Sequence, residues 1–75
     1  MTQYRNVGGN SGVLAYENNA DSITVTFKDG ATYLYNYSSA GINNIETMKD
    51  LAVNGRGLNS FISTTVKKNY CSKLS

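Results

Sequence analysis

The stretch SITVTFKDGATYLYNY, residues 22–37, decides the fold. Residues 22–27 alternate hydroxyl and apolar side chains, and residues 32–37 alternate again after the turn-forming pair Asp29-Gly30. Alternation with a period of two is typical of a half-buried strand, and a glycine can adopt the positive φ that a tight turn requires. The stretch therefore predicts an antiparallel β-hairpin.

A third strand is expected before the hairpin. Val13 to Tyr16 form a short apolar run, and the turn formers at 18–21 separate this run from residues 22–27. The simplest arrangement is a three-stranded antiparallel meander. Residues 1–11 end in Gly-Gly-Asn-Ser and show little periodicity, so we expect a flexible N-terminal arm followed by a single domain over residues 12–75.

The pattern after the hairpin changes to a period of three to four residues, which predicts helices. Either Ser38 or Ser39 is expected to cap a helix that begins at Ala40 and ends near Val53, because Asn54-Gly55 favours a left-handed stop. The apolar stripe of this helix comprises Ile42, Ile45, Met48, Leu51 and Ala52.

A second helix is expected from Leu58 to near Tyr70. Its propensity is weaker, because serine, threonine and valine are frequent in it, so its stability must come from packing. Its apolar stripe comprises Leu58, Phe61, Ile62, Thr65 and Val66. The predicted fold class is α+β: a three-stranded antiparallel meander followed by two helices packed on one face (β-β-β-α-α).

Composition narrows the classes of function. The chain of 75 residues has the length of one domain and contains no histidine and a single cysteine, Cys71. It therefore lacks the usual acid/base group, an internal disulfide and a zinc-type cluster, and its five acidic residues show no pairing pattern. We expect no catalysis, no metal and no cofactor. No apolar run approaches the ~20 residues of a membrane span, so we expect no membrane association and a cytoplasmic location.

Tyr33, Tyr35 and Tyr37 share one face of the predicted second hairpin strand, and the hairpin loop decides which face. A two-residue loop at Asp29-Gly30 pairs Val25 with Leu34 and leaves the tyrosines as an exposed aromatic ladder. A three-residue loop at 28–30 places Tyr33 opposite Val25, which turns the rings toward the core. Exposed rings would suit the stacking of nucleic-acid bases. The pattern fits both registers.

Phosphate groups would require cationic partners, and the net charge of +2 permits an anionic ligand. Lys67-Lys68 could serve this purpose or could complement a helix dipole at a C-terminus. Gly55-Arg56-Gly57, between the two helices, could bind an anion next to free N–H groups, although Asn-Gly is also a routine helix stop. The candidate cations are Arg5, Lys28, Arg56, Lys67, Lys68 and Lys73.

Several short pieces between Ser11 and Tyr70 occur in a characteristic order and spacing. They are Phe27-Lys28-Asp29-Gly30, Tyr33-Leu34-Tyr35, Ala52 to Gly55, Asn59 with Ile62, and Lys68-Asn69-Tyr70. Their order and spacing resemble the KTSC domain, a small module named for the C-terminus of some lysyl-tRNA synthetases and also found alone in bacteria and phages. The chain departs from the family at Tyr37-Ser38-Ser39, where a Val-Pro is usual. The resemblance implies the fold above and suggests RNA binding.

Two functions follow as hypotheses. The first is a small non-catalytic module that binds RNA or another nucleotide-containing ligand through Tyr33, Tyr35 and Tyr37 with neighbouring cations. The alternative is a phage or mobile-element protein that caps a host protein or sequesters a small signalling nucleotide. A third hypothesis is a purely structural homo-oligomer formed through an exposed edge strand.

Overall fold

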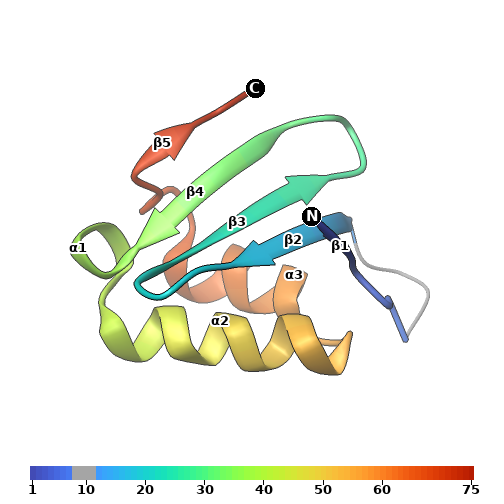
Figure 1. Ribbon diagram of the computed structural model, residues 1–75, viewed down its shortest axis with the longest axis horizontal. Coiled ribbons are helices and arrows are strands. Elements are labelled where there is room, and N and C mark those ends of the chain that lie inside the picture. The colour runs from blue at the N-terminus through green and yellow to red at the C-terminus, as the bar shows by residue number, and fades with distance from the viewer. Residues whose placement is uncertain (8–11) are drawn as a thin grey trace.

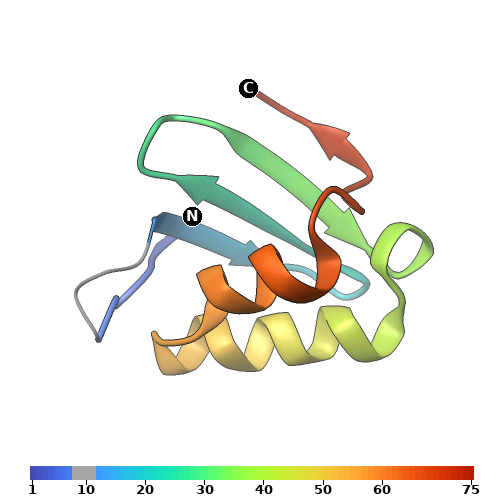
Figure 2. The same cartoon turned by 180° about the vertical axis from the view of Figure 1, so that it is seen from behind.

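The computed structural model describes residues 1–7 and 12–75 and has an α+β architecture, with the helices on one face of an antiparallel sheet (Figures 1 and 2). The described residues form five strands that are paired in sequence order. The predicted meander lies in the middle of this sheet, and a short strand is added at each edge, so the prediction of three strands was too few. The strands are β1 (Thr2–Gln3), β2 (Val13–Asn18), β3 (Ser22–Phe27), β4 (Thr32–Asn36) and β5 (Ser72–Lys73).

The hairpin between β3 and β4 has the three-residue loop. Val25 pairs with Tyr33, and Ile23 pairs with Tyr35. The N–H of Gly30 donates to the carbonyl of Phe27 at 2.9 Å, and Gly30 has a φ of 93°. Of the two registers that the sequence allows, the structure therefore has the one that turns Tyr33 and Tyr35 toward the core, and the exposed ladder of three tyrosines does not form. This register places Ile23 and Val25 on the same side as large apolar partners.

The core lies between this face of the sheet and the helices. Its members come from every layer, and most are fully withdrawn from solvent. Burying one large aliphatic side chain contributes about 1.5–3 kcal/mol, so the fold depends on the sheet and the helices packing together. The buried apolar residues are Tyr4, Val13, Tyr16, Ile23, Val25, Tyr35, Ile45, Met48, Ala52, Leu58, Ile62 and Val66.

The first predicted helix, Ala40 to near Val53, corresponds to α2 (Ile42–Asn54), and a separate short helix that was not predicted, α1 (Tyr37–Ala40), precedes it. The cap of α1 is Asn36, whose side chain accepts from the backbone N–H of Ser39 at 2.8 Å. The predicted serine cap is therefore corrected, and Tyr37 begins a helix instead of extending the strand. The predicted stop is confirmed, because Gly55 ends α2 with a left-handed φ of 77°.

The second predicted helix is shorter than expected. It consists of α3 (Leu58–Phe61) and the π-helix η1 (Ile62–Val66), and Lys67 ends it. The residues 64–66 are all β-branched, and the Thr64 hydroxyl donates to the Ser60 carbonyl at 2.8 Å, which competes with regular helical bonding. The chain therefore leaves the helix before Tyr70 and returns to the sheet as β5.

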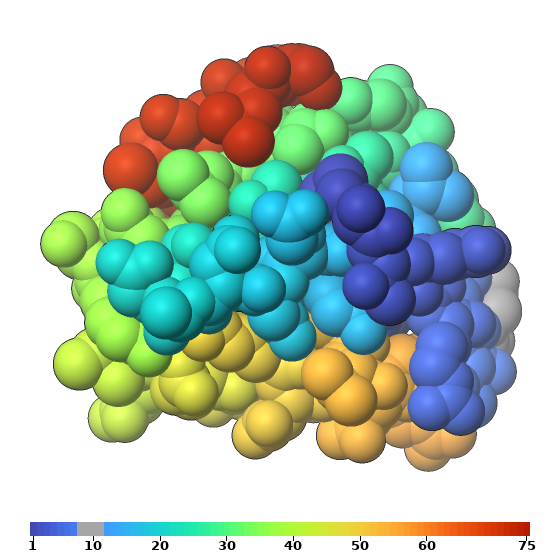
Figure 3. All heavy atoms as spheres, viewed as in Figure 1, coloured from blue at the N-terminus to red at the C-terminus, as the bar shows by residue number. Residues whose placement is uncertain are grey.

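Residues 1–7 of the predicted arm pack against the domain. The side chain of Tyr4 is only 3% exposed, and its hydroxyl accepts from the N–H of Leu58 at 3.3 Å. The N–H of Val7 donates to the carbonyl of Gly55 at 2.7 Å. Figure 3 shows the first residues, in dark blue, lying across the surface next to β2. The rest of the predicted arm, residues 8–11, lies outside the described residues.

Candidate nucleic-acid interface

Three half-buried aromatic rings contact one another on the face of the sheet that carries the helices. The ring centroids of Tyr33 and Tyr70 are 4.6 Å apart, and Phe27 meets Tyr33 edge-on at 5.8 Å. We call Phe27, Tyr33 and Tyr70 the aromatic ledge. The Nζ atom of Lys73 lies 5.8 Å from the Tyr33 centroid, within the range of a cation–π contact. Each ring is partly open to solvent, so the ledge can offer aromatic surface to a ligand.

The backbone explains why these residues meet. The three-residue hairpin loop places Phe27 and Tyr33 on the same face of adjacent strands. The chain then returns after η1, which brings Tyr70 over the sheet, and β5 pairs Lys73 directly with Tyr33. Residues that are far apart in the sequence therefore converge on β4. Figure 3 shows the C-terminal residues, in red, at the surface beside β4.

Tyr35 supports the ledge from below and is closed to a ligand. Its side chain is 2% exposed, its ring meets Tyr70 edge-on at 6.2 Å, and its hydroxyl donates to the carbonyl of Lys67 at 3.4 Å. Burial raises the pKa of Tyr35 to about 12, with a smaller contribution from the neighbouring Tyr33 and Tyr70. Tyr35 therefore stays neutral at physiological pH and packs beneath the ledge as a core residue.

Four lysines lie on the segments that carry the ledge. Lys28 follows Phe27 in the hairpin loop, Lys67 and Lys68 form the turn that precedes Tyr70, and Lys73 contacts Tyr33. All four lysines are exposed. Residues 51–75 contain four of the seven basic residues of the chain and none of the five acidic ones. Within this third, residues 67–73 carry three lysines and no acidic residue, which favours an anionic ligand beside Tyr70 and Lys73.

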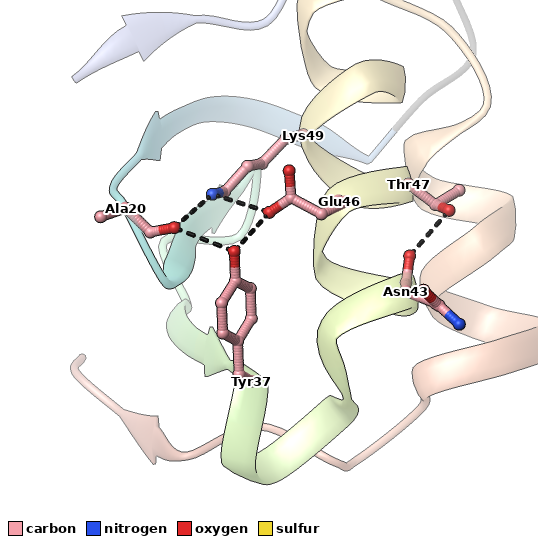
Figure 4. A network of polar contacts seen from close by, with 6 residues as sticks. All are labelled: Ala20, Tyr37, Asn43, Glu46, Thr47 and Lys49. Carbon is pink, nitrogen blue, oxygen red and sulfur yellow. Dashed lines mark hydrogen bonds and ion pairs between the residues drawn. The ribbon is translucent and has the colours of Figure 1, made fainter.

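Tyr37 lies away from the ledge, in a polar network that Figure 4 shows. Its hydroxyl donates to Oε2 of Glu46 at 2.7 Å and lies 3.0 Å from the carbonyl oxygen of Ala20. Lys49 donates to the same two acceptors, at 3.1 Å and 3.0 Å respectively. The network ties the turn between β2 and β3 to α1 and α2, which is a structural task.

The network also shifts two pKa values. The hydrogen bond to Glu46 raises the pKa of Tyr37, chiefly because the carboxylate favours the protonated hydroxyl. The same bond, followed by that from Lys49, lowers the pKa of Glu46. Both shifts reflect the same contact and hold the network together at neutral pH.

The link Gly55-Arg56-Gly57 does not join the ledge. Arg56 is exposed, and Figure 2 shows this link at the far end of α3 and η1 from β5. The first N–H of α3, at Leu58, already donates to Tyr4, and α3 itself has only four residues. Arg5, another candidate cation, packs its Cβ near Gly55. Residues 1–7 therefore pack against this link.

Sequence reasoning missed the roles of Phe27 and Tyr70 and named Lys73 only as one cation among six. Phe27 carried a signal, because the three-residue loop puts it on the same face of the sheet as Tyr33. Tyr70 was assigned to a helix, and no local pattern predicted that it would contact Tyr33. Of the named candidates, the structure brings Lys73 to Tyr33 and buries Tyr35 beneath the ledge. Lys28, Lys67 and Lys68 are exposed on segments that adjoin the ledge, whereas Tyr37 and Arg56 lie elsewhere.

Two further features of the described residues concern metal binding and membrane spans. Within residues 1–7 and 12–75, no group of three or more histidine, cysteine, aspartate or glutamate side chains is placed to hold a metal ion. Over the same residues, no helix has both the length and the apolar character to cross a membrane.

Comparisons with known proteins place no further constraint on the chain. No protein-family model matches it, and no curated protein or solved structure matches it either. The resemblance to the KTSC domain therefore stays a prediction from the sequence.

Proposed function

We propose that this chain is a small non-catalytic module that binds RNA, or another nucleotide-containing ligand, at the aromatic ledge and its surrounding lysines. One observation carries the proposal: the half-buried ring of Tyr33 already has a cation, Lys73 Nζ, 5.8 Å from its centroid. The ring is therefore open enough at the surface to accept a contact from outside the core.

The interaction energies favour the replacement of Lys73 on the Tyr33 ring by a stacked base. A cation–π contact at an exposed site is worth about 0.5–1 kcal/mol, whereas a base stacked on an aromatic ring is worth about 1–3 kcal/mol. A base that displaces Lys73 from Tyr33 would also free an ammonium group beside the ligand. That ammonium can then pair with the adjacent phosphate, so little of the original contact energy is lost.

Charge supports the same ligand class. Lys28 lies at the hairpin end of the ledge, and Lys67 and Lys68 lie at the end near Tyr70. For a single strand, each phosphate contact contributes about −0.7 to the slope of log affinity against log salt concentration. Contacts from these three lysines and from the displaced Lys73 would give a slope of about −2.8.

The test is fluorescence anisotropy with a labelled oligouridylate of about ten nucleotides, within the range of site sizes of small single-strand-binding domains. Binding at low salt, weakened by Tyr33→Leu and by Lys73→Gln, is expected. Tyr33→Leu retains apolar bulk and removes the aromatic face. The matched control is Arg56→Gln, which removes an exposed charge at the far end of the helices and is expected to leave affinity unchanged. Equal affinity for all four proteins would refute the assignment of the site.

The ledge also suits a small signalling nucleotide, which is the alternative ligand at the same site. A free mononucleotide can reach fewer lysines than a strand, so we expect it to compete only weakly with the oligonucleotide. Strong competition would favour the signalling ligand. The capping of a host protein receives less support, because the exposed apolar side chains belong to different elements, among them Leu14 on β2, Ile42 and Val53 on α2, and Leu74 after β5.

A homo-oligomer through an edge strand would have to use β1 or β5, which are the edges of the sheet. Each strand is only two residues long, so each offers few backbone groups for pairing between chains. Light scattering tests this directly, and we expect a monomer at low micromolar concentration.

A further inference from the structure

The turn after η1 holds a lysine in a backbone conformation that favours glycine. Lys67 has a φ of 48° and a ψ of −114°, and the N–H of Asn69 donates to the carbonyl of Val66 at 2.8 Å. These angles match the first central position of a type II′ turn, where glycine predominates because a Cβ is poorly tolerated. Lys67 and Asn6 are the non-glycine residues with positive φ in the described part of the chain, and asparagine tolerates that region far better than lysine.

The Lys67 side chain gives the fold nothing that explains this strain. It is exposed, and its ammonium makes no hydrogen bond or ion pair with any residue that the structure describes. The useful contacts of Lys67 come from its backbone: its N–H donates to Ile62 at 2.6 Å, and its carbonyl accepts from Tyr35. Glycine could make both contacts without strain. A strained residue whose side chain is unused by the fold points to a role outside the fold.

The position of the turn indicates which role. Tyr35, whose hydroxyl bonds to Lys67, lies beneath Tyr70, and Tyr70 packs on Tyr33. Lys67 is therefore fixed to the end of the aromatic ledge by the same contacts that build the ledge. The strained turn directs the chain back to the sheet and leaves two consecutive exposed lysines beside it.

We propose that Lys67 is a phosphate-contacting residue of the ledge, retained in a strained type II′ position because its charge is required there. The proposal rests on the proposed function and assigns one residue of that site. The proposal predicts that replacing Lys67 with glycine raises stability and lowers affinity for the ligand. The reading of Lys67 as a complement to a helix dipole makes the contrary prediction, because removing a favourable charge would lower stability.

The experiment combines thermal melts with anisotropy against the same labelled oligouridylate of about ten nucleotides. For Lys67→Gly we expect Tm to rise by about 4 °C as strain is relieved. We expect affinity to fall roughly three- to tenfold, and the salt slope to become shallower by about 0.7, the value for one lost contact. Lys67→Asn is expected to lose affinity to the same extent and to gain less in Tm, because asparagine is better tolerated than lysine at this turn position but keeps its Cβ.

Two controls separate charge from backbone. Lys67→Gln removes the charge and keeps the strain, so affinity should fall as in Lys67→Gly while Tm stays unchanged. Arg56→Gln should change neither quantity. If the wild-type chain does not bind the oligonucleotide, the proposed function fails and the role of Lys67 fails with it. If the wild type binds and both Lys67→Gly and Lys67→Gln bind as tightly as the wild type, only the role of Lys67 is overturned. A lower Tm for Lys67→Gly would overturn the strain argument and favour the dipole reading.

Discussion

Replacing Gly55 with alanine is expected to loosen residues 1–7 as well as strain the end of α2. Gly55 has a φ of 77°, and a Cβ on it would lie 2.6 Å from the Cβ of Arg5 and 3.3 Å from Cγ2 of Val7. Real Cβ atoms essentially never approach other heavy atoms that closely, so the backbone at Arg5 must shift. The hydrogen bond from Val7 to the Gly55 carbonyl would then weaken.

Gly57 provides a matched control in the same link. Its φ is 82°, and an added Cβ would meet only Leu51, at an ordinary 3.4 Å. Both alanine variants incur the cost of a left-handed backbone, about 1–2 kcal/mol. Gly55→Ala should also lose a hydrogen bond worth about 0.5–1.5 kcal/mol, together with some burial of Tyr4. We therefore expect Gly55→Ala to destabilise the protein by about 1–2 kcal/mol more than Gly57→Ala, as the sum of these two losses.

Urea unfolding measures this difference in the free energy of unfolding. Adding Arg5→Gly to Gly55→Ala removes the clashing Cβ and should recover much of the excess, whereas adding it to Gly57→Ala should not. Hydrogen exchange at Tyr4 and Val7 should accelerate in Gly55→Ala alone. Equal destabilisation by the two alanine substitutions, with no rescue by Arg5→Gly, would refute the docking of residues 1–7 on Gly55.

Three further predictions concern stability and binding. The pKa of Tyr35 is raised from 10.0 to about 12, so its neutral form stabilises the fold below pH 10. The free energy of unfolding should therefore fall as pH rises from 10 to 12. Urea unfolding of Tyr35→Phe should show a shallower fall over the same range. Because the pKa of Glu46 is lowered, its carboxylate contributes to the free energy of unfolding above pH 4.5, its ordinary pKa. This contribution should be lost as pH falls below that value. In thermal melts, Glu46→Gln should lack this loss, and an acid dependence identical to the wild type would contradict the network. Lys73→Gln should weaken oligonucleotide binding in anisotropy. It should lower Tm by only a few degrees, because the cation–π contact that it loses is exposed and worth about 0.5–1 kcal/mol. A much larger fall in Tm would instead make Lys73 structural.

The central elements of the fold could be predicted because their signals are local. The alternation in residues 22–27 and 32–36 specifies two strands, and Gly55 specifies the end of α2. The register could not be settled from that alternation, because a period of two fits both hairpin loops equally well. It depends on which face meets the helices, and only the assembled core decides that.

The parts that were missed depend on contacts between distant residues. β1 and β5 are two residues long, which is too short to show any periodicity. Tyr4 and Tyr70 become core or ledge residues only because they reach Leu58 and Tyr33. Tyr37 was assigned to a strand because the competing side-chain cap at Asn36 gives a weaker signal than the alternation before it.

The most direct test of ligand binding at the aromatic ledge is an NMR titration of the isotope-labelled chain with the oligouridylate at low salt. We expect the largest shifts at the amides of Phe27, Tyr33, Tyr70 and Lys73, and loss of these shifts in Tyr33→Leu. The link at Arg56 and the network around Tyr37 should show little change. Shifts confined to those two regions, or no shifts at high micromolar ligand, would contradict a nucleic-acid site at the ledge.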